Sequence, residues 1–396
     1  MTLAEERRAL VVLLGVIYLM IAGFGLVIPL LPFFAKAFHA DAGEVTLMFS
    51  AFSLGQFIGE PFWGKLSDRI GRRPVLIGTI AMVGVSYAAL AFAPSIWAAF
   101  AIRFLNGIFA GNISTLQGAL ADITPPERRA QRMGIMGAAF SAGFTTGPAI
   151  GGLLAQPAKG ALGFQLPLLV AAGFAFASAL AVVLFVRESR PERPAHFSPV
   201  RTARLREGFG HPVISRVVMI SFIVVVGFAG IEATYGLWTQ TRFGWGPRQI
   251  GLAFMVIGVL GAVCQGWLCG RLARTYGEAR TLTGGLVMMG LGIAIQGLSP
   301  NWMVAILGFA FVCIGQSICF PNVSALISRA APPDRQGEML GLNMSGMALA
   351  RIGGPIMAGQ LFALIQPGAP FAFSAVLILP ALWFAWSVIQ RTPRLA

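Results

Sequence analysis

The chain has 396 residues, of which 56% are hydrophobic and 11% charged, and its formal net charge is +14. A typical soluble domain is about 25% charged, so the composition excludes a soluble globular protein and predicts a protein that crosses a membrane several times. A nucleic-acid binder would place its basic residues beside aromatic residues on a polar face, whereas here they occupy short gaps between apolar segments.

Apolar segments long enough to cross a bilayer as helices, about 20 residues each, follow one another along the chain. The first comes after "MTLAEERRAL" and is longer than the core of a cleavable signal peptide, so we expect it to remain in the protein. The sequence predicts an all-α membrane protein with twelve spans, at 9–35, 45–64, 75–93, 96–121, 133–155, 166–187, 214–240, 249–270, 281–298, 302–328, 339–364 and 370–390.

Lysine and arginine are distributed unequally between the two sides of these spans. Of the 29 residues, 23 lie on the side of the N-terminus, four lie on the other side, and Arg103 and Arg351 fall inside spans. Such a bias marks the cytoplasmic side, so we expect a multi-pass protein of the cell inner membrane with both termini in the cytoplasm. The polar stretch 188–213 is rich in Pro and Arg and predicts a cytoplasmic linker between a first domain, 1–187, and a second, 214–396.

The two predicted domains repeat each other. At an offset of 206 or 207 residues, three pairs of segments align: "GKLSDRIGRRPVLIG" (64–78) with "GRLARTYGEARTLTG" (270–284), "TPPERRAQRMG" (124–134) with "APPDRQGEMLG" (331–341), and "TTGPAIGG" (145–152) with "IGGPIMAG" (352–359). Six spans return the chain to its starting side, so the repeats are parallel. Two six-helix bundles are expected, with a substrate site between them near the middle of the membrane.

The stretch "GKLSDRIGRRP", Gly64–Pro74, collects charge between two spans that carry little. Its cations Arg69, Arg72 and Arg73 are expected at the carboxyl end of the second span, where they suit the helix dipole and hold the turn on the cytoplasmic side. Gly71 permits a tight turn.

Asp68 is the one acid of this stretch, and none of these reasons requires it. Gly64 allows close packing, and Pro74 is expected to open the third span. In the repeat the position of Asp68 is held by Arg274, so the acid is present in only one half.

Charged residues inside spans are the first candidates for function. Glu232 is the only acid deep inside a span, and burial favours the neutral form of a carboxyl, which can then exchange protons near neutral pH. Glu60 lies closer to the cytoplasmic end. A charge at the membrane centre costs about 2.5–3.5 kcal/mol, so Arg103 should face protein or water. Arg351 either pairs with an acid or binds an anionic group of a substrate.

Aromatic, methionine and uncharged polar residues inside spans are candidates for lining an apolar cavity, which suits flat, lipophilic compounds. For the aromatic residues, packing within the protein or anchoring at the membrane surface is the alternative. The candidates are Phe24, Phe140, Tyr235, Trp238, Met20, Met347, Asn112, Gln316 and Asn343.

Four patterns resemble those of the major facilitator superfamily, specifically its twelve-span drug:proton antiporters: "GKLSDRIGRRP" between spans two and three, "RFLNGIFAG" from Arg103 in span four, "GFTTGPAIGG" (143–152) in span five and "PLLP" (29–32) at the end of span one. The third matches the antiporter signature G-x-x-x-G-P-x-x-G-G at every fixed position. Its glycines recur at helical spacing and leave a bare face for close helix contact.

With the repeat, the resemblance covers essentially the whole chain, and it implies export of small amphipathic compounds by proton antiport and alternating access. It implies proton coupling for Arg103, beside Glu232 and Glu60. It implies that Asp68 latches the outward-facing state, pairing with nearby Arg residues and with the amino end of span eleven near Gly337–Gly341. The latch set is Asp68, Arg69, Arg72, Gly64 and Gly71, and the helix that closes against the other half carries Gly143, Gly147, Pro148, Gly151 and Gly152.

The branch that looks most similar is that of the tetracycline exporters, whose members carry membrane acids at the approximate positions of Met20, Ser86 and Met289. None of these three is an acid, so the sequence predicts a relative with different chemistry and broader drug export. The alternative within transport is a symporter or facilitator for a sugar or other small metabolite, and a non-transporting receptor or scaffold is an alternative of another class.

The sequence contains no G-x-x-x-x-G-K-[ST] phosphate loop, no metal-ligand cluster among its three His and no arguable Ser–His–Asp arrangement. We therefore expect a protein that is not an enzyme, binds no cofactor or metal, and draws its energy from an ion gradient. The expected partners are a small-molecule substrate, protons and the lipid bilayer, with no nucleic acid and a monomer as the working unit.

Overall fold

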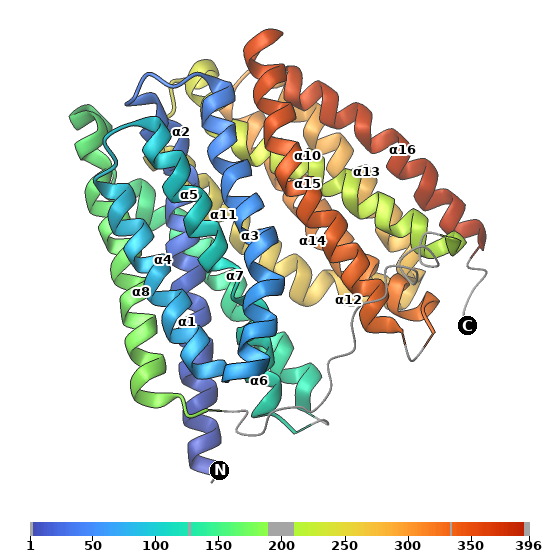
Figure 1. Cartoon of the computed structure of the whole chain (residues 1–396). Coiled ribbons are helices and arrows are strands. Elements are labelled where there is room, and N and C mark those ends of the chain that lie inside the picture. The colour runs from blue at the N-terminus through green and yellow to red at the C-terminus, as the bar shows by residue number, and fades with distance from the viewer. Residues whose placement is uncertain (1–2, 126–127, 189–209, 333–334, 392–396) are drawn as a thin grey trace. The chain divides into compact units, whose positions relative to one another are not determined.

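The computed structural model describes residues 3–125, 128–188, 210–332 and 335–391, and in this part of the chain every regular element is helical (Figure 1). The chain forms two compact units. The described residues of Met1–Phe197 and of Trp245–Val256 belong to the first, and those of Ser198–Gly244 and Ile257–Ala396 belong to the second.

The first unit contains the first six spans. Asp41 begins one of them with a capping box, in which its carboxylate accepts from the backbone of Glu44 at 2.8 Å and the Glu44 side chain accepts from the backbone of Asp41 at 3.0 Å. The helices are α1 (Leu3–Val27), η1 (Ile28–Leu30), α2 (Leu31–Lys36), α3 (Ala42–Ile70), α4 (Arg72–Ala91), α5 (Ile96–Ala110), α6 (Ile113–Asp122), α7 (Arg129–Leu154), η3 (Pro157–Phe164) and α8 (Gln165–Phe185).

The last six spans follow. They belong to the second unit, except for the first part of the eighth span, which belongs to the first unit. A π-helical turn interrupts this eighth span. The helices are α10 (Pro212–Phe243), α11 (Pro247–Val263), η4 (Cys264–Leu268), α12 (Cys269–Tyr276), α13 (Glu278–Leu298), α14 (Trp302–Ala330), α15 (Gln336–Leu364) and α16 (Ala369–Arg391).

The same pairs of spans pack together in both units, as the repeat predicts. In the first unit, α1 lies against α7 and α8, and α4 lies against α5 and α8. In the second unit, α10 lies against α15 and α16, and α13 lies against α14 and α16. The predicted fold, an all-α membrane protein with twelve spans in two six-helix bundles, is confirmed.

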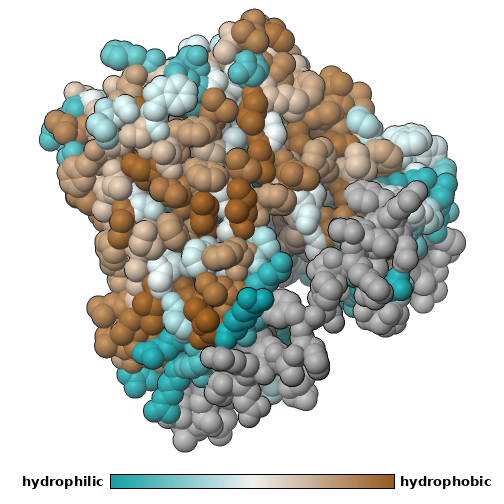
Figure 2. All heavy atoms as spheres, in the orientation of Figure 1, coloured by the Kyte–Doolittle hydropathy of each residue, from teal (hydrophilic) through white to brown (hydrophobic). Residues whose placement is uncertain are grey.

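Ten helical stretches of the described residues are long and apolar enough to cross a membrane by composition alone. The spans α3 and α7 are not among them, because glycine, serine, threonine and other weakly apolar or polar residues interrupt their apolar runs. On the face drawn in Figure 2, apolar side chains cover the middle of the helices and hydrophilic side chains gather near their ends. This distribution suits a lipid environment.

Glycines bring α3 and α5 into backbone contact. A Cβ atom added at Gly55 or Gly59 of α3, at Gly107 of α5 or at Gly111, which follows α5, would collide with the backbone of the facing helix. Trp63 on α3 also donates from Nε1 to a backbone carbonyl of α5 at 2.7 Å. Paired small residues four positions apart allow this approach between membrane helices.

In the second unit, glycines place a different pair of helices in the same kind of contact. A Cβ atom added at Gly292 of α13 would lie 2.6 Å from the carbonyl oxygen of Gly308 on α14, and one added at Gly315 would lie 2.6 Å from that of Gly285. The spans in contact here are the third and fourth of their half, whereas α3 and α5 are the second and fourth. The two halves share a topology but differ in where glycine draws their helices together.

Candidate functional site

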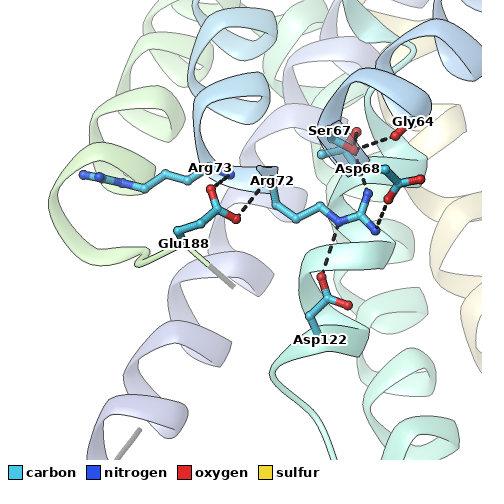
Figure 3. Close-up of polar contacts among 8 residues, drawn as sticks. Gly64, Ser67, Asp68, Arg72, Arg73, Asp122 and Glu188 are labelled. Carbon is cyan, nitrogen blue, oxygen red and sulfur yellow. Dashed lines mark hydrogen bonds and ion pairs between the residues drawn. The ribbon is translucent and has the colours of Figure 1, made fainter. Parts of the chain in front are cut away.

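Arg72 is the centre of the polar cluster at the loop after α3 (Figure 3). Its Nη2 atom lies 2.8 Å from Oδ1 of Asp68, its Nη1 atom donates to Oγ of Ser67 at 2.6 Å, and its Nε atom lies 3.3 Å from Oδ2 of Asp122. The Arg72 residue is buried. One guanidinium therefore joins the last turns of α3 to the last residue of α6, and the predicted residues Asp68 and Arg72 are in direct contact.

Arg72 and Arg73 are the first residues of α4, so the prediction that they lie at the carboxyl end of the second span is wrong. Cations at the amino end of a helix are opposed by its dipole. Glu188, which follows α8, compensates: its carboxylate accepts from the backbone N–H of Arg72 at 2.8 Å and from that of Arg73 at 3.1 Å. Pro74 is accordingly the third residue of α4, and not the residue that opens it.

Gly71, between α3 and α4, has a φ of 104°, which only glycine adopts readily. A Cβ atom at this position would also collide with the carboxylate of Glu188. The glycine is required twice, by the backbone and by the capping carboxylate. Arg69 lies in the last turn of α3, as expected, and the carbonyl of Gly64 accepts a hydrogen bond from Ser67 at 2.8 Å.

Sequence reasoning did not find Asp122 and Glu188. Each is the first acid to follow a long apolar segment, on the side of the protein where lysine and arginine are concentrated. An isolated acid in that place is the signal that points to a partner among the nearby cations. The sequence does not say which cation, because Asp122 and Glu188 lie 50 and 116 residues from Arg72.

Arg103 is 1% exposed inside the first unit. Its Nη1 atom donates to Oδ1 of Asn106 at 3.3 Å, and its guanidinium lies 4.4 Å from the ring centroid of Phe52. The ring of Phe52 packs on that of Phe24 at 5.1 Å, so two of the predicted residues, Arg103 and Phe24, meet around one ring. The side chains that hold this arginine are an amide and an aromatic ring, both neutral.

The fourth span breaks at Gly111, between α5 and α6. Glu60 of α3 lies beside Gly111 and is partly buried, and Asn112, the residue that follows Gly111 in the chain, is fully buried. The Nδ2 atom of Asn112 donates to Oγ1 of Thr79 on α4 at 2.9 Å. This bond links the break to a neighbouring span and favours a packing role for Asn112.

Glu232 on α10 is partly buried in the second unit and interacts electrostatically with Arg351 on α15. Arg351 is exposed, and its pairing with an acid or with an anionic group of a substrate stays a prediction. Cys313 on α14 also interacts with Glu232. Gln316, one turn further along α14, is partly buried.

Tyr235 and Trp238 are buried among aromatic side chains of the second unit. The ring of Tyr235 stacks on that of Phe309 with a centroid distance of 4.4 Å, and the ring of Trp238 packs on that of Phe371 at 4.7 Å. Both rings are almost inaccessible, which favours the packing alternative for them. Phe140 on α7 is exposed.

Asn343 on α15 is buried and donates from Nδ2 to Sδ of Met347 at 3.3 Å. Both residues line a small cavity with Ser221 of α10 and Cys319 of α14. The Oδ1 atom of Asn343 is buried without a hydrogen-bond partner. The cavity is apolar apart from these groups and has room for about one water molecule.

The glycine-rich helix α7 has two packed faces. Cβ atoms added at Gly143, Gly147 or Gly151 would collide with the backbone of α1. Gly152 lies equally close to the backbone of Pro247 at the start of α11, in the part of that helix that belongs to the first unit, and the carbonyl of Pro148 lies against Gly251 of the same turns. The predicted glycine face is a contact surface, and its closing role stays a prediction.

The described residues include no group of three or more His, Cys, Asp or Glu side chains that could hold a metal ion. The positions where the tetracycline branch carries acids lie inside spans. Met289 of α13 and Ser86 of α4 are buried, Met20 of α1 is partly buried, and Ser86 donates to a backbone carbonyl of its own helix at 2.7 Å.

Comparison with known proteins gives matches along the whole chain. The family model described as Major Facilitator Superfamily matches residues 13–275 and 220–396. "Tetracycline resistance protein, class C" of Escherichia coli is 30% identical over 367 residues, 91% of each chain. "Multidrug resistance protein 2" of Bacillus subtilis is 27% identical and covers 96% of this chain and 94% of its own. "Quinolone resistance protein NorA" of Staphylococcus aureus is 25% identical, with 87% and 88% covered.

Solved structures match over the full length as well. The human organic anion transporter MFSD10 (TETRAN) is 27% identical, with a TM-score of 0.71 and 96% of this chain and 99% of that chain covered. A bacterial homolog of the human lysosomal transporter Spinster reaches a TM-score of 0.82 at 15% identity, with 98% of both chains covered. The second similarity concerns the fold alone.

Proposed function

Because the chain belongs to the Major Facilitator Superfamily, we propose that it exports small amphipathic organic compounds in exchange for protons. It is a multi-pass membrane transporter and not an enzyme. The observation that carries the proposal is the end-to-end similarity to tetracycline, multidrug and quinolone resistance proteins, which extends over 87–98% of the chain. Resistance to drugs is what those names have in common, and a membrane transporter can confer resistance by exporting the drug.

Glu232 is the proposed proton carrier. Its carboxylate lies within the electrostatic range of Arg351 inside the second unit, so its protonation changes the charge that Arg351 experiences. In the proposed cycle, a proton from outside neutralises Glu232 and the compound leaves. Release of the proton toward the cytoplasm then resets the site. Arg103 and Glu60 remain secondary candidates for proton coupling.

The cluster around Arg72 is the proposed conformational latch, and α7 is the proposed gate. The support is that Asp68, Arg72, Asp122 and Glu188 form one bonded group beside Gly71, so a change at one of them reaches the end of α3, the start of α4, the end of α6 and the residue that follows α8. On α7, close backbone contacts leave no room for side chains at the signature glycines.

Everted membrane vesicles with an acid interior test the exchange. Adding tetracycline or a fluoroquinolone should raise the interior pH as the compound enters and protons leave. In Glu232→Gln this response should fall at least about tenfold, because the side chain keeps its size but cannot carry a proton.

Asp41→Asn is the matched control for the loss of one acid, since Asn caps a helix as well as Asp does. A wild-type response to neither compound would count against exchange of these drugs for protons. A Glu232→Gln protein that couples as well as wild type would remove Glu232 from the mechanism.

Export of organic anions is the second candidate function. It is favoured by Arg103, whose buried guanidinium is held by neutral groups, and by the similarity to the human organic anion transporter. Anionic fluorescein and cationic ethidium distinguish the two candidates. Uptake of fluorescein but not of ethidium by the same vesicles would favour this second function.

A further inference from the structure

An ion pair joins the start of α13 to the end of α14 in the second unit. The Nη2 atom of Arg329 lies 2.7 Å from Oε1 of Glu278. Glu278 is the first residue of α13, and Arg329 lies in the last turn of α14. None of the transporter signatures in the sequence includes either residue.

The first unit contains an ion pair in the equivalent place. Arg72 is the first residue of α4, Asp122 is the last residue of α6, and their Nε and Oδ2 atoms are 3.3 Å apart. The repeat offset of 206 maps position 72 onto 278, and the offset of 207 maps position 122 onto 329. The same two helix ends are therefore joined in each unit, but the charges are exchanged.

The backbone at this point is alike in both units. Gly71 precedes α4 with a φ of 104°, and Gly277 precedes α13 with a φ of 81°. The exchange of sign also extends to a third position, since Asp68, which pairs with Arg72, corresponds to Arg274. A change of sign at one partner alone would place like charges together, whereas a change at both keeps the attraction. The feature common to the units is the attraction itself.

We infer that Glu278 and Arg329 are positioning residues that hold the adjoining ends of the third and fourth spans of the second half together, as Arg72 and Asp122 do in the first. Held in this way, the two spans move as one piece during transport. The inference rests on the proposed function only for its effect on transport. Glu278 also suits the amino end of α13 through the helix dipole.

Reversal of charge tests the pair in the purified full-length protein. In Glu278→Arg and in Arg329→Glu, like charges meet, and amide hydrogen exchange at the start of α13 and the end of α14 should become about two- to fivefold faster. In the double variant Glu278→Arg/Arg329→Glu the attraction returns with exchanged signs. Exchange should fall back most of the way to the wild-type rate, since the reversed charges now oppose the helix dipoles at both helix ends. Arg280→Glu is the control, because Arg280 is an exposed cation two residues from Glu278 on the same helix.

Transport of tetracycline into vesicles supplies the second measurement. Each single reversal should lower the maximal rate about threefold or more at an unchanged KM, and the double variant should restore it. If gel filtration shows that a reversal variant is misfolded, Glu278→Gln or Arg329→Gln takes its place. These variants remove the attraction without adding repulsion.

Single reversals that exchange hydrogen like the wild type, or a double variant as fast as the singles, would overturn the inference. If the wild type transports none of the probes, the proposed function fails by itself. The hydrogen-exchange comparison then decides whether the ion pair holds the two spans together.

Discussion

Arg72 interacts with the rest of the first unit through its backbone and its side chain separately. The backbone N–H bonds to Glu188, while the guanidinium reaches Asp68 and Asp122. These contacts offset the unfavourable position of a cation at the amino end of a helix. The arginine can therefore serve as the centre of a latch without weakening the start of α4.

Gly71→Ala is expected to destabilise the protein and slow transport, whereas Gly78→Ala on α4 is not. At Gly71 the φ of 104° and the nearby carboxylate of Glu188 both oppose a side chain, and a strained backbone of this kind costs about 1–3 kcal/mol. A Cβ atom at Gly78 meets nothing within 4 Å. Thermal melting of the purified variants and drug transport by vesicles check this. Equal melting temperatures would show that the turn tolerates a side chain.

The sequence predicted this loop as a functional element and the pairing of Asp68 with a nearby arginine, but it did not predict the contacts of Arg72 with Asp122 and Glu188. The signature contains Asp68 and Arg72 four residues apart at a helix end, a spacing at which side chains meet. Asp122 and Glu188 come from other spans, so their contact with Arg72 depends on how α6 and the end of α8 pack. A pattern within eleven residues carries no information about that packing.

At the scale of helices, glycine decides which spans touch. Most positions of a membrane helix tolerate any apolar residue, because lipid accepts them all. At Gly107 the backbone of α3 occupies the space that a side chain would need. Packing between membrane helices relies on such close contacts, since lipid gives no hydrophobic drive for association.

Gly107→Ala should lower the free energy of unfolding by about 1–3 kcal/mol, the usual cost of overpacking. Gly173→Ala on α8, where an added Cβ atom meets nothing within 4 Å, should leave it unchanged. The melting temperatures of the two variants in the same detergent make the comparison. A Gly107→Ala protein as stable as Gly173→Ala would mean that α3 and α5 separate without loss.

The sequence predicted the spans well and their interruptions poorly. Long apolar runs define a span through composition alone. At the break between α5 and α6, Asn112 bonds to Thr79 of another helix, and the second interruption is the π-helical turn Cys264–Leu268. Hydropathy alone marks neither of them.

At the scale of the whole molecule, the repeat predicted two six-helix bundles, and equivalent spans pack together in both because duplicated sequences bury equivalent faces. The repeat carries no information on the substrate contacts, which stay a prediction. Tyr235 and Trp238 are aromatic residues of the kind that line drug pockets, yet both are buried among aromatic neighbours. Phe24, Phe140, Gln316 and Arg351, which are not fully buried, are the residues we propose as substrate contacts.

Orientation in the membrane follows from the distribution of cations and is tested by labelling. A cysteine at Lys159, in η3 between α7 and α8, should react with a membrane-impermeant maleimide in intact cells. A cysteine at Lys65, near the end of α3, should react only after permeabilisation, because loops rich in lysine and arginine stay in the cytoplasm. The unaltered protein gives the background from its own four cysteines. The reverse pattern would place both termini outside.

The bond from Glu188 to the start of α4 matters to anyone who wishes to produce the two halves as separate polypeptides. By hydropathy, the first half ends at residue 187. A gene divided there would place Glu188 on the second fragment, away from α4. The amino end of α4 would then carry Arg72 and Arg73 with no cap. Division of the gene downstream of Glu188 keeps this cap on the fragment that carries α4.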